Sequence, residues 1–197
     1  MLAQELLEQP KMSNHARGLW GYSGETADGT ALTIQATGMG GPSAAIVLAD
    51  LAELGVRRAV RVGTCAALGE AAPELGTVLV VGAARAEGAS AAPFGLSPGE
   101  EAEPDADLTA RLCHRLENAP TPVTVASFDT IALDSLERSG ATFADMQTAT
   151  VFACGASLDM KVAGVVIVEA ALSGEKIADE DLEGAAKLAG RAAAGVL

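Results

Sequence analysis

Residues 31–69 carry the pattern that most restricts how this chain can fold. Residues 31–36 alternate toward an apolar strand pattern, and Gly38, Gly40 and Gly41 follow at once. Because glycine has no Cβ, such a cluster makes a turn that larger residues would not make. The pattern therefore predicts a strand that ends in a tight turn.

A helix and a second strand are predicted directly after the turn. Pro42 suits the first turn of a helix, apolar residues continue at helical spacing over residues 45–52, and Gly55 ends the helix. The second strand covers residues 58–62 and ends at a corner of small residues, 63–67. Strand, helix and strand together predict a βαβ unit with a right-handed crossover.

Both corners of this unit are candidates for one binding pocket. In an open α/β sheet, ligands bind outside the carboxyl ends of the strands, where residues 37–43 and 63–67 are expected to lie. Arg61 stands two residues before the second corner, inside a predicted buried strand, where a charge needs a partner. The residues alone leave two alternatives for Arg61: a bound anion, or a structural contact with backbone carbonyls or a carboxylate.

Length and composition allow one domain, residues 1–197. A chain of 19.7 kDa buries one substantial core but is too short for two ordinary domains. Apolar residues make up 49% of the chain and aromatic residues only 3%. A core of alanine, valine, leucine and isoleucine suits helices packed on a buried sheet.

Charge and cysteine content exclude several classes of function. A formal net charge of -13 would repel a nucleic-acid backbone or an anionic membrane surface, so neither is an expected partner. Cys65, Cys113 and Cys154 are odd in number and widely spaced, which predicts reduced thiols and no metal site. No long apolar run or basic signal region occurs near Met1, so a cytoplasmic protein is expected.

The amino-terminal segment predicts a hairpin. Residues 1–11 have the pattern of a short amphipathic packing helix or a frayed end that stops at Pro10, and no strand is expected there. Residues 13–24 and the strand that begins at Ala31 flank a turn at residues 27–29, so the two flanks are expected to pair.

The rest of the chain alternates strands with helices. Further strands are predicted at residues 77–84, 123–127 and 162–168, and further helices at residues 108–118, 143–160 and 178–197. Asp107 is expected to cap the first of these helices. Residues 91–107 are expected to form a long loop, and the acidic run within it is expected to be a solvated face.

Residues 37–69 resemble a known family. The stretch TGMGGPSAAIVLADLAELGVRRAVRVGTCAALG is similar to the glycine turn, helix and R-[VI]-G-[ST] strand end of the purine nucleoside phosphorylase and uridine phosphorylase superfamily. The resemblance covers residues 13–197. It implies a single-domain, three-layer α/β sandwich whose central mixed, twisted sheet is flanked by helices.

The resemblance also implies a reaction. In this family, phosphate attacks the sugar and cleaves the N-glycosidic bond of a nucleoside, giving the free base and pentose 1-phosphate. Phosphate is then a co-substrate, and no cofactor or metal is implied. Family pockets are completed by a neighbouring subunit, so a homo-oligomer is expected, either a dimer or a trimer of dimers.

Carried over position by position, the resemblance implies a set of site residues. Phosphate would be held by Arg61, Thr64 and, from the hairpin of a neighbouring subunit, Arg17. The nucleoside would contact Met39, Cys65, Ala66, Ile131, Asp145, Met146 and Gln147. The catalytic set would be Arg61, Gln147 and Glu169.

The chain also departs from the family at several of these places. The Gly-Asp-Pro turn and arginine that hold phosphate in the family have no counterpart near the amino terminus. Gln147 replaces a glutamate that binds the ribose hydroxyls, and Ile131 replaces an aromatic residue that stacks on the base. Ala170 stands where purine-specific members have an aspartate acid, and Glu169, one residue earlier, would point the opposite way in a strand.

These departures leave alternatives open. A degenerate nucleoside-binding paralogue that serves as a sensor or partner subunit fits the missing groups. An N-ribosyl hydrolase of the same fold is a further alternative, against which the retained Arg61 argues. The uracil-reading glutamine is absent from residues 134–138, and the sequence leaves the base and the sugar open.

Overall fold

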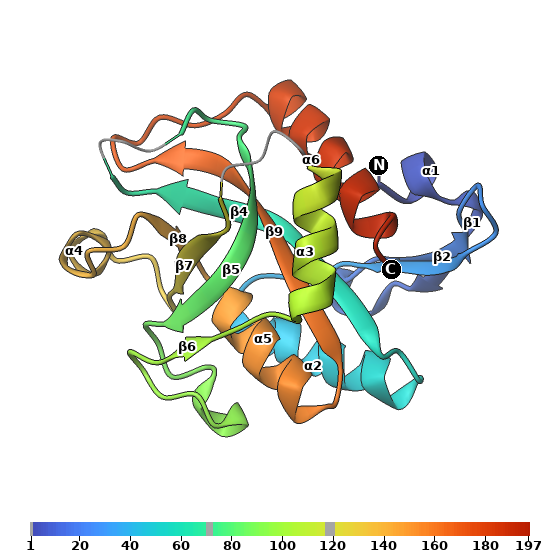
Figure 1. Cartoon of the computed structure of the whole chain (residues 1–197), viewed down its shortest axis with the longest axis horizontal. Coiled ribbons are helices and arrows are strands. Elements are labelled where there is room, and N and C mark those ends of the chain that lie inside the picture. The colour runs from blue at the N-terminus through green and yellow to red at the C-terminus, as the bar shows by residue number, and fades with distance from the viewer. Residues whose placement is uncertain (1, 70–72, 117–120) are drawn as a thin grey trace.

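A mixed six-stranded sheet forms the centre of the molecule (Figure 1). The computed structural model describes residues 2–69, 73–116 and 121–197. In spatial order the strands are β6 (Glu101–Ala102), β5 (Val78–Ala86), β7 (Val123–Ser127), β8 (Phe143–Asp145), β4 (Arg58–Ala67) and β9 (Lys161–Ala171). The pairs β5–β7, β7–β8 and β4–β9 are parallel, and the pairs β5–β6, β4–β8 and β5–β9 are antiparallel. Strand β9 thus pairs with β5 as well as with β4. The sheet therefore curls until its two sides meet.

Helices cover both faces of this sheet. One face carries α2 (Gly41–Glu53) and α5 (Thr148–Ser157), and the other carries α3 (Ala106–Arg115) and α6 (Asp179–Ala194). Strand β9 shows the division, because Val166 packs on the α2 and α5 side while Val165 and Ile167 pack on the α3 and α6 side. The predicted three-layer α/β architecture is confirmed.

A small antiparallel sheet lies to one side of the central sheet, at the right of Figure 1. It consists of β1 (Glu8–Asn14), β2 (Gly21–Glu25) and β3 (Ala31–Gln35), which confirms the predicted hairpin. The short helix α1 (Leu2–Leu6) precedes it and packs against α6, where the side chains of Glu5 and Arg191 are 2.6 Å apart.

Two predictions about this region were wrong. No strand was expected before Lys11, but β1 begins at Glu8 and accommodates Pro10 because it is an edge strand with an irregular register. The βαβ unit is also absent, since β3 belongs to the small sheet and β4 to the central one. The alternation in residues 31–35 identified a strand without identifying its sheet.

Several element boundaries differ from the prediction as well. Strand β4 continues to Ala67, so residues 63–67 are part of the strand and not a corner after it. Residues 143–145 form β8, and the helix predicted from residue 143 begins only at Thr148. The helix predicted to reach Asn118 is described to Arg115, and Asn118 and Pro120 lie outside the described residues.

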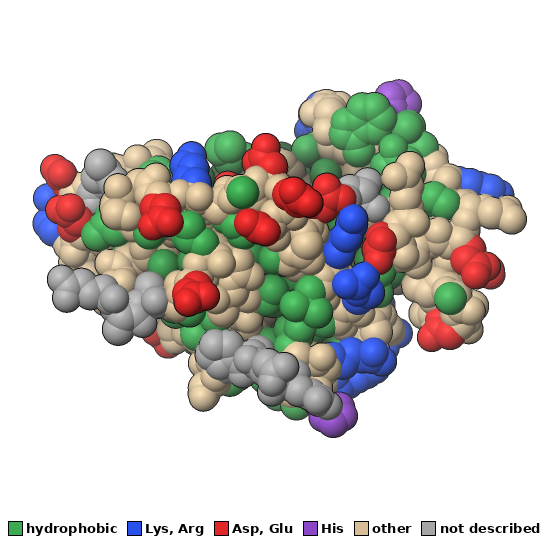
Figure 2. Space-filling model, turned by 90° about the horizontal axis from the view of Figure 1, so that it is seen from above, with side chains coloured by type: hydrophobic (Ala, Val, Ile, Leu, Met, Phe, Trp, Pro, Cys, Tyr) green, Lys and Arg blue, Asp and Glu red, His purple; other side chains and the backbone are tan. Residues whose placement is uncertain are grey.

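Short elements complete the chain. They are the 3-10 turns η1 (Ala16–Gly18) and η2 (Ala92–Phe94) and the helix α4 (Leu133–Arg138). Among the described residues, no helix has the length and apolar character needed to cross a lipid bilayer. Figure 2 shows acidic and basic side chains interspersed over one face, and in the whole sequence 26 acidic residues against 13 Lys and Arg give a net charge of -13.

The cap of α3 provides a first test of the structure. Asp105, not the predicted Asp107, is the N-cap, and its carboxylate accepts a hydrogen bond from the Leu108 amide at 2.9 Å. We expect Asp105→Ala to lower the free energy of unfolding by about 1 kcal/mol. Asp107→Ala, which removes a surface charge from the first turn, is the matched control and should cost less. Urea unfolding measures both, and an equal cost would contradict this assignment.

Candidate active site at the start of helix α5

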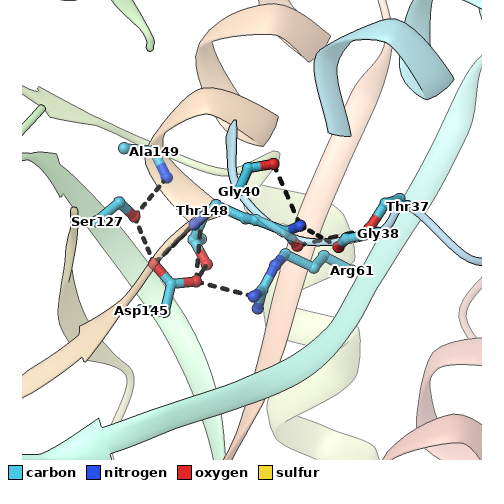
Figure 3. Close-up of polar contacts among 9 residues, drawn as sticks. Thr37, Gly38, Gly40, Arg61, Ser127, Asp145, Thr148 and Ala149 are labelled. Carbon is cyan, nitrogen blue, oxygen red and sulfur yellow. Dashed lines mark hydrogen bonds and ion pairs between the residues drawn. The ribbon is translucent and has the colours of Figure 1, made fainter. Parts of the chain in front are cut away.

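The candidate site lies where β4, the end of β8, the glycine turn and the first turn of α5 meet (Figure 3). Asp145 is the last residue of β8, and Thr148 is the first residue of α5. Only Met146 and Gln147 separate strand from helix. This short connection places the Asp145 carboxylate directly against the free amides of the helix terminus.

The Asp145 carboxylate is buried and held by several donors. One of its oxygens accepts a hydrogen bond from the Ser127 hydroxyl at 2.6 Å, and the other accepts from the Thr148 amide at 3.1 Å and the Thr148 hydroxyl at 2.5 Å. Ser127 in turn accepts a hydrogen bond from the Ala149 amide at 2.9 Å. A carboxylate at a helix N-terminus is stabilised by the free amides and by the helix dipole.

Arg61 forms an ion pair with Asp145 of the same chain. Its Nη2 lies 2.9 Å from the Asp145 carboxylate, and the two side chains are only 10% and 1% exposed. The structural alternative for Arg61 therefore holds for this nitrogen. However, Nε and Nη1 of Arg61 are buried and have no hydrogen-bond partner among the described residues. Unpaired buried donors are costly, so an oxygen placed against these two N–H groups would satisfy them.

Gly63 makes room for the Arg61 side chain. A Cβ on Gly63 would lie 2.6 Å from the Arg61 Cζ, so the guanidinium lies directly over the strand at that point. Residues 61, 63 and 65 share one face of β4 because side chains alternate along a strand. The glycine of the R-V-G-T pattern is thus needed for the arginine to lie flat on the sheet.

Gln147 joins the start of α5 to the glycine turn. Its Nε2 donates to the carbonyl of Gly38 at 2.6 Å and to the carbonyl of Gly40 at 3.3 Å, and its Oε1 lies 3.5 Å from the Thr37 hydroxyl. The side chain is buried. We call this set of contacts the Gln147 latch. It brings the glycine turn beside the Arg61–Asp145 pair, as Figure 3 shows.

The glycine turn has its own local supports. Gly38 and Gly40 have φ of 71° and 83°, which favours glycine, and the Ser43 hydroxyl donates to the Thr37 carbonyl at 2.6 Å. A Cβ on Gly41 would lie 2.4 Å from the Thr150 hydroxyl oxygen, so α2 and α5 approach very closely here. The glycines therefore serve both the turn and the contact between the two helices.

The other residues predicted from β4 occupy different environments. Cys65 is buried on the Arg61 face, and Ala66 pairs with Ala144 of β8. Thr64 alternates with Arg61, which directs its side chain to the face that carries Val62. No hydrogen bond joins Thr64 to Arg61 among the described contacts. The structure does not bring these two side chains to one face.

Two predicted nucleoside contacts and one predicted phosphate contact lie on the surface of the chain. Met39 in the glycine turn is 81% exposed, and Ile131 after β7 is 71% exposed. Arg17 is exposed in η1 with a left-handed backbone, φ 55° and ψ 23°. In a single chain these side chains are free for contact with a ligand or with a neighbouring subunit.

Glu169 lies inside β9, which continues to Ala171. A proton-donating role for it required the strand to have ended, and this condition is not met. The register shifts here, because Val168 pairs with Cys65 and Ala170 pairs with Ala66, so Glu169 is the extra residue of a bulge. The Glu169 charge contributes a small part of the rise in the pKa of Cys65, so Glu169 lies near the site.

An open hollow of about 470 Å³ lies at the carboxyl ends of β5 and β7. It is lined by Glu87, Gly88, Phe128, Asp129, Thr130, Ser135, Arg138 and Ser139. A second, smaller depression shares Gly88 and Asp129 with the hollow and is lined by Ser127 and Met146, but it has no room for a water molecule. Packed side chains therefore separate the hollow from the Asp145 network. The wall of the hollow is braced by Asp129, whose carboxylate accepts hydrogen bonds from the Ala89 amide, at 2.7 Å, and from the Ser90 hydroxyl.

Sequence reasoning missed Ser127, Thr148 and Asp129 as members of this region. Ser127 and Asp129 belong to the stretch SFDTI over residues 127–131, in which only Ile131 was assigned a role. Thr148 follows an aspartate by three residues, D-x-x-T, and capping chemistry at a helix start was the signal that could have identified it. Within the described ranges, no group of histidine, cysteine and acidic side chains is arranged to hold a metal ion.

Comparison with known proteins identifies the family. The family model described as "Phosphorylase superfamily" matches residues 1–197. The chain belongs to this superfamily, which includes the purine nucleoside and uridine phosphorylases.

Two of the relatives are similar over most of the chain, and a third over about a third of it. A purine nucleoside phosphorylase DeoD-type 2 of Vibrio vulnificus is 29% identical over 200 residues, covering 91% of this chain and 80% of that protein. A guanosine phosphorylase of Halorubrum lacusprofundi is 32% identical over 170 residues, covering 79% and 68%. A DeoD-type enzyme of Oceanobacillus iheyensis is 43% identical over 68 residues, 34% of this chain and 28% of that protein.

A solved structure confirms the fold. The uridine phosphorylase of Vibrio fischeri superposes with a TM-score of 0.83, covering 98% of this chain and 84% of that one, at 23% sequence identity. The nucleoside phosphorylase fold predicted from the glycine turn and the R-V-G-T strand is therefore present.

The Arg61–Asp145 pair predicts an asymmetric response to mutation. Asp145→Asn leaves the Arg61 charge buried without a counter-charge, so we expect a loss of about 3–5 kcal/mol of stability. Arg61→Met should cost less, because Asp145 keeps its hydrogen bonds from Ser127 and Thr148. Denaturant unfolding of both variants and of the double variant measures the difference. A larger loss for Arg61→Met would show that Arg61, not Asp145, organises the network.

The cysteines give a second test of this region. Burial raises the pKa of Cys65 to about 12, with a further rise from the Asp145 charge that Arg61 partly opposes. Burial also raises the pKa of Cys154. Because the thiolate is the reactive form, iodoacetamide at pH 8 should label Cys113, which is half-buried, and spare the other two until the protein unfolds. Mass spectrometry of peptides checks this order, and early labelling of Cys65 would contradict it.

Proposed function

We propose that this protein cleaves the N-glycosidic bond of a nucleoside with phosphate, releasing the free base and pentose 1-phosphate. The observation that carries the proposal is the buried Arg61 guanidinium with two unpartnered N–H groups beside a helix N-terminus. Family membership supplies the reaction class. A phosphate oxygen is a strong acceptor for such N–H groups, and the α5 terminus favours an anion nearby.

The proposed anion site has less positive charge than a site built on an unpaired arginine. Asp145 already neutralises Arg61, so a phosphate bound at Nε and Nη1 would lie near a carboxylate and be repelled. A second cation is therefore needed, and Arg17 from the hairpin of a neighbouring subunit is the proposed source. In this proposal the protein acts as a homo-oligomer in the cytoplasm, a dimer or a trimer of dimers.

The nucleoside is proposed to occupy the space between the glycine turn and the open hollow. Met146 would contact the sugar, while Met39 and Ile131, exposed in a single chain, would become covered by nucleoside or neighbour. Cys65 and Ala66 would form the floor. The hollow around Phe128 and Asp129 would receive the base. Its polar lining does not select between a purine and a pyrimidine.

This site lacks a well-placed general acid to protonate the departing base. Ala170 has no proton to donate, and Glu169 stands inside β9, where the condition for a proton-donating role is not met. Loss of a well-placed general acid typically costs about 10²–10⁴-fold in rate. The proposal is therefore a slow phosphorylase.

Hydrolysis is the second candidate function, and the Arg61–Asp145 pair favours it. The retained arginine argued for a phosphate clamp, but a self-neutralised guanidinium suits a neutral oxygen, such as water, as well as an anion. Phosphate dependence distinguishes the two reactions.

The test is release of free base from a panel of inosine, guanosine, adenosine and uridine, with and without inorganic phosphate. We expect slow, phosphate-dependent release. Arg61→Met should lower kcat/KM by about 10²-fold or more, as loss of a preorganised donor does. Arg111→Met, which removes an exposed arginine from α3, is the matched control and should leave turnover unchanged.

Each other result has a defined meaning. Release that is the same without phosphate would replace phosphorolysis by hydrolysis. Tight nucleoside binding without release would identify a nucleoside-binding protein that has lost catalysis, a sensor or partner subunit. Neither release nor binding for any nucleoside would refute the proposal.

A further inference from the structure

We infer that the free edge of β4 is a docking site for an extended segment of another polypeptide, which adds a strand to the central sheet. By the free edge we mean the main-chain groups of residues 58–64 on the side of β4 that faces away from β9. This interaction is independent of the proposed reaction. The hydrogen-bond partners of β4, taken residue by residue, define the edge.

Strand β9 satisfies only half of the main-chain groups of β4. The Lys161 amide donates to the Arg57 carbonyl at 2.9 Å, and the two strands run parallel from Arg58 onward. In a parallel pair, alternate residues direct both of their main-chain groups to the same neighbour, so residues 59, 61 and 63 bond to β9. Residues 58, 60, 62 and 64 therefore direct their N–H and C=O groups to the opposite side.

No strand among the described residues pairs with these outward groups. Strand β8 lies on this side of β4 but pairs with it only at Ala66 and Ala67, beyond the free edge. Within the described ranges, no other main-chain hydrogen bond reaches residues 58, 60, 62 or 64. The side chains of Val60 and Val62 are half-buried, whereas those of their partners on β9, residues 163 and 165, are fully buried. The edge is thus accessible.

The free edge also lacks the usual protection of a strand border. Proteins protect such borders with proline, with bulges or with a covering segment. Residues 58–64 contain no proline, their pairing with β9 is regular, and the bulge comes only after Cys65. Unpaired donors and acceptors in a regular strand are the template that strand addition uses. An added strand would complete the hydrogen bonding of β4 on its second side.

The two faces of β4 define the side chains that the added strand would carry. Val60 and Val62 pack on the α3 and α6 side, so β-branched apolar residues fit beside them. On the other face, Arg61 lies over Gly63 and has two buried N–H groups without a described partner. Small residues with a hydroxyl fit there, because an uncharged oxygen satisfies donors without adding charge beside Asp145. The net charge of -13 favours a segment with basic ends.

A second copy of this chain fits the same edge less well. Antiparallel pairing of residues 58–64 with themselves across a two-fold axis sets Arg61 directly opposite the partner's Arg61. Like charges at opposite positions destabilise a strand pair. A segment of a different polypeptide, with alternating apolar and hydroxyl side chains, meets no such conflict.

The first experiment measures amide exchange in the free protein by NMR. We expect the amides of residues 60, 62 and 64 to exchange at least about tenfold faster than those of residues 59, 61 and 63, because only the latter donate to β9. Equal protection of both sets at every protein concentration would show that the edge is already covered and would overturn the inference. Protection of residues 60, 62 and 64 that rises with protein concentration would make a second copy the occupant, and overturns it as well.

The second experiment supplies a strand, the acetylated and amidated peptide KSVTVSVTK. We expect a dissociation constant below about 1 mM and slower exchange at residues 60, 62 and 64. Two control peptides of the same charge carry N-methyl groups, one on the odd and one on the even positions. Because each control loses the donors of one edge, one of them should bind about tenfold or more weakly and the other should keep its affinity. Equal binding of all three peptides, or no binding of the first, contradicts strand addition.

A pair of protein variants completes the test. V60P removes one outward donor and no bond to β9, so it should weaken peptide binding by about tenfold while the amides of β9 stay protected. E101P removes an outward N–H from β6, at another border of the same sheet, and is the matched control that should bind like the wild type. Loss of affinity in both variants, or in neither, rejects the free edge as the site. If V60P does not fold, the methylated peptides decide.

Discussion

A single buried carboxylate, that of Asp145, joins the parts of this molecule that matter for function. It ends β8, caps α5, receives the hydroxyl of Ser127 from β7 and balances the charge of Arg61 from β4. A buried charge of this kind is stable only when it is paired and hydrogen-bonded, and Asp145 satisfies both conditions. One carboxylate therefore holds β4, β7 and the β8–α5 connection in a single arrangement.

The arrangement has an electrostatic consequence. Arg61 is not a free cation, because Asp145 already balances its charge, yet two of its N–H groups have no partner within the part of the chain that the structure describes. The site is thus polar and hydrogen-bond donating, with little net charge of its own. Affinity for an anion would require a further cation, whereas an uncharged oxygen ligand meets no such requirement.

The sequence was sufficient for the fold and for part of the site. The glycine turn, the helix after it and the R-V-G-T strand have strong local patterns, and all three elements are present. The assignment of β3 to the central sheet was wrong because alternation reports that a strand exists but not which strands it pairs with. The Arg61–Asp145 pair was not predicted, since 84 positions separate two residues that only the folded sheet brings together. Gln147 was read as a ligand contact for the same reason, as its partners lie in the glycine turn.

The closure of the central sheet has a consequence for how copies of this chain can associate. Because β9 pairs with both β4 and β5, the sheet is closed along the paired parts of these strands. Strand segments that already have partners on both sides cannot recruit a strand from another molecule. Association over the closed part of the sheet therefore uses side-chain surfaces, such as the outer sides of α2 and of the small sheet, where Met12, Trp20 and Ile46 face solvent.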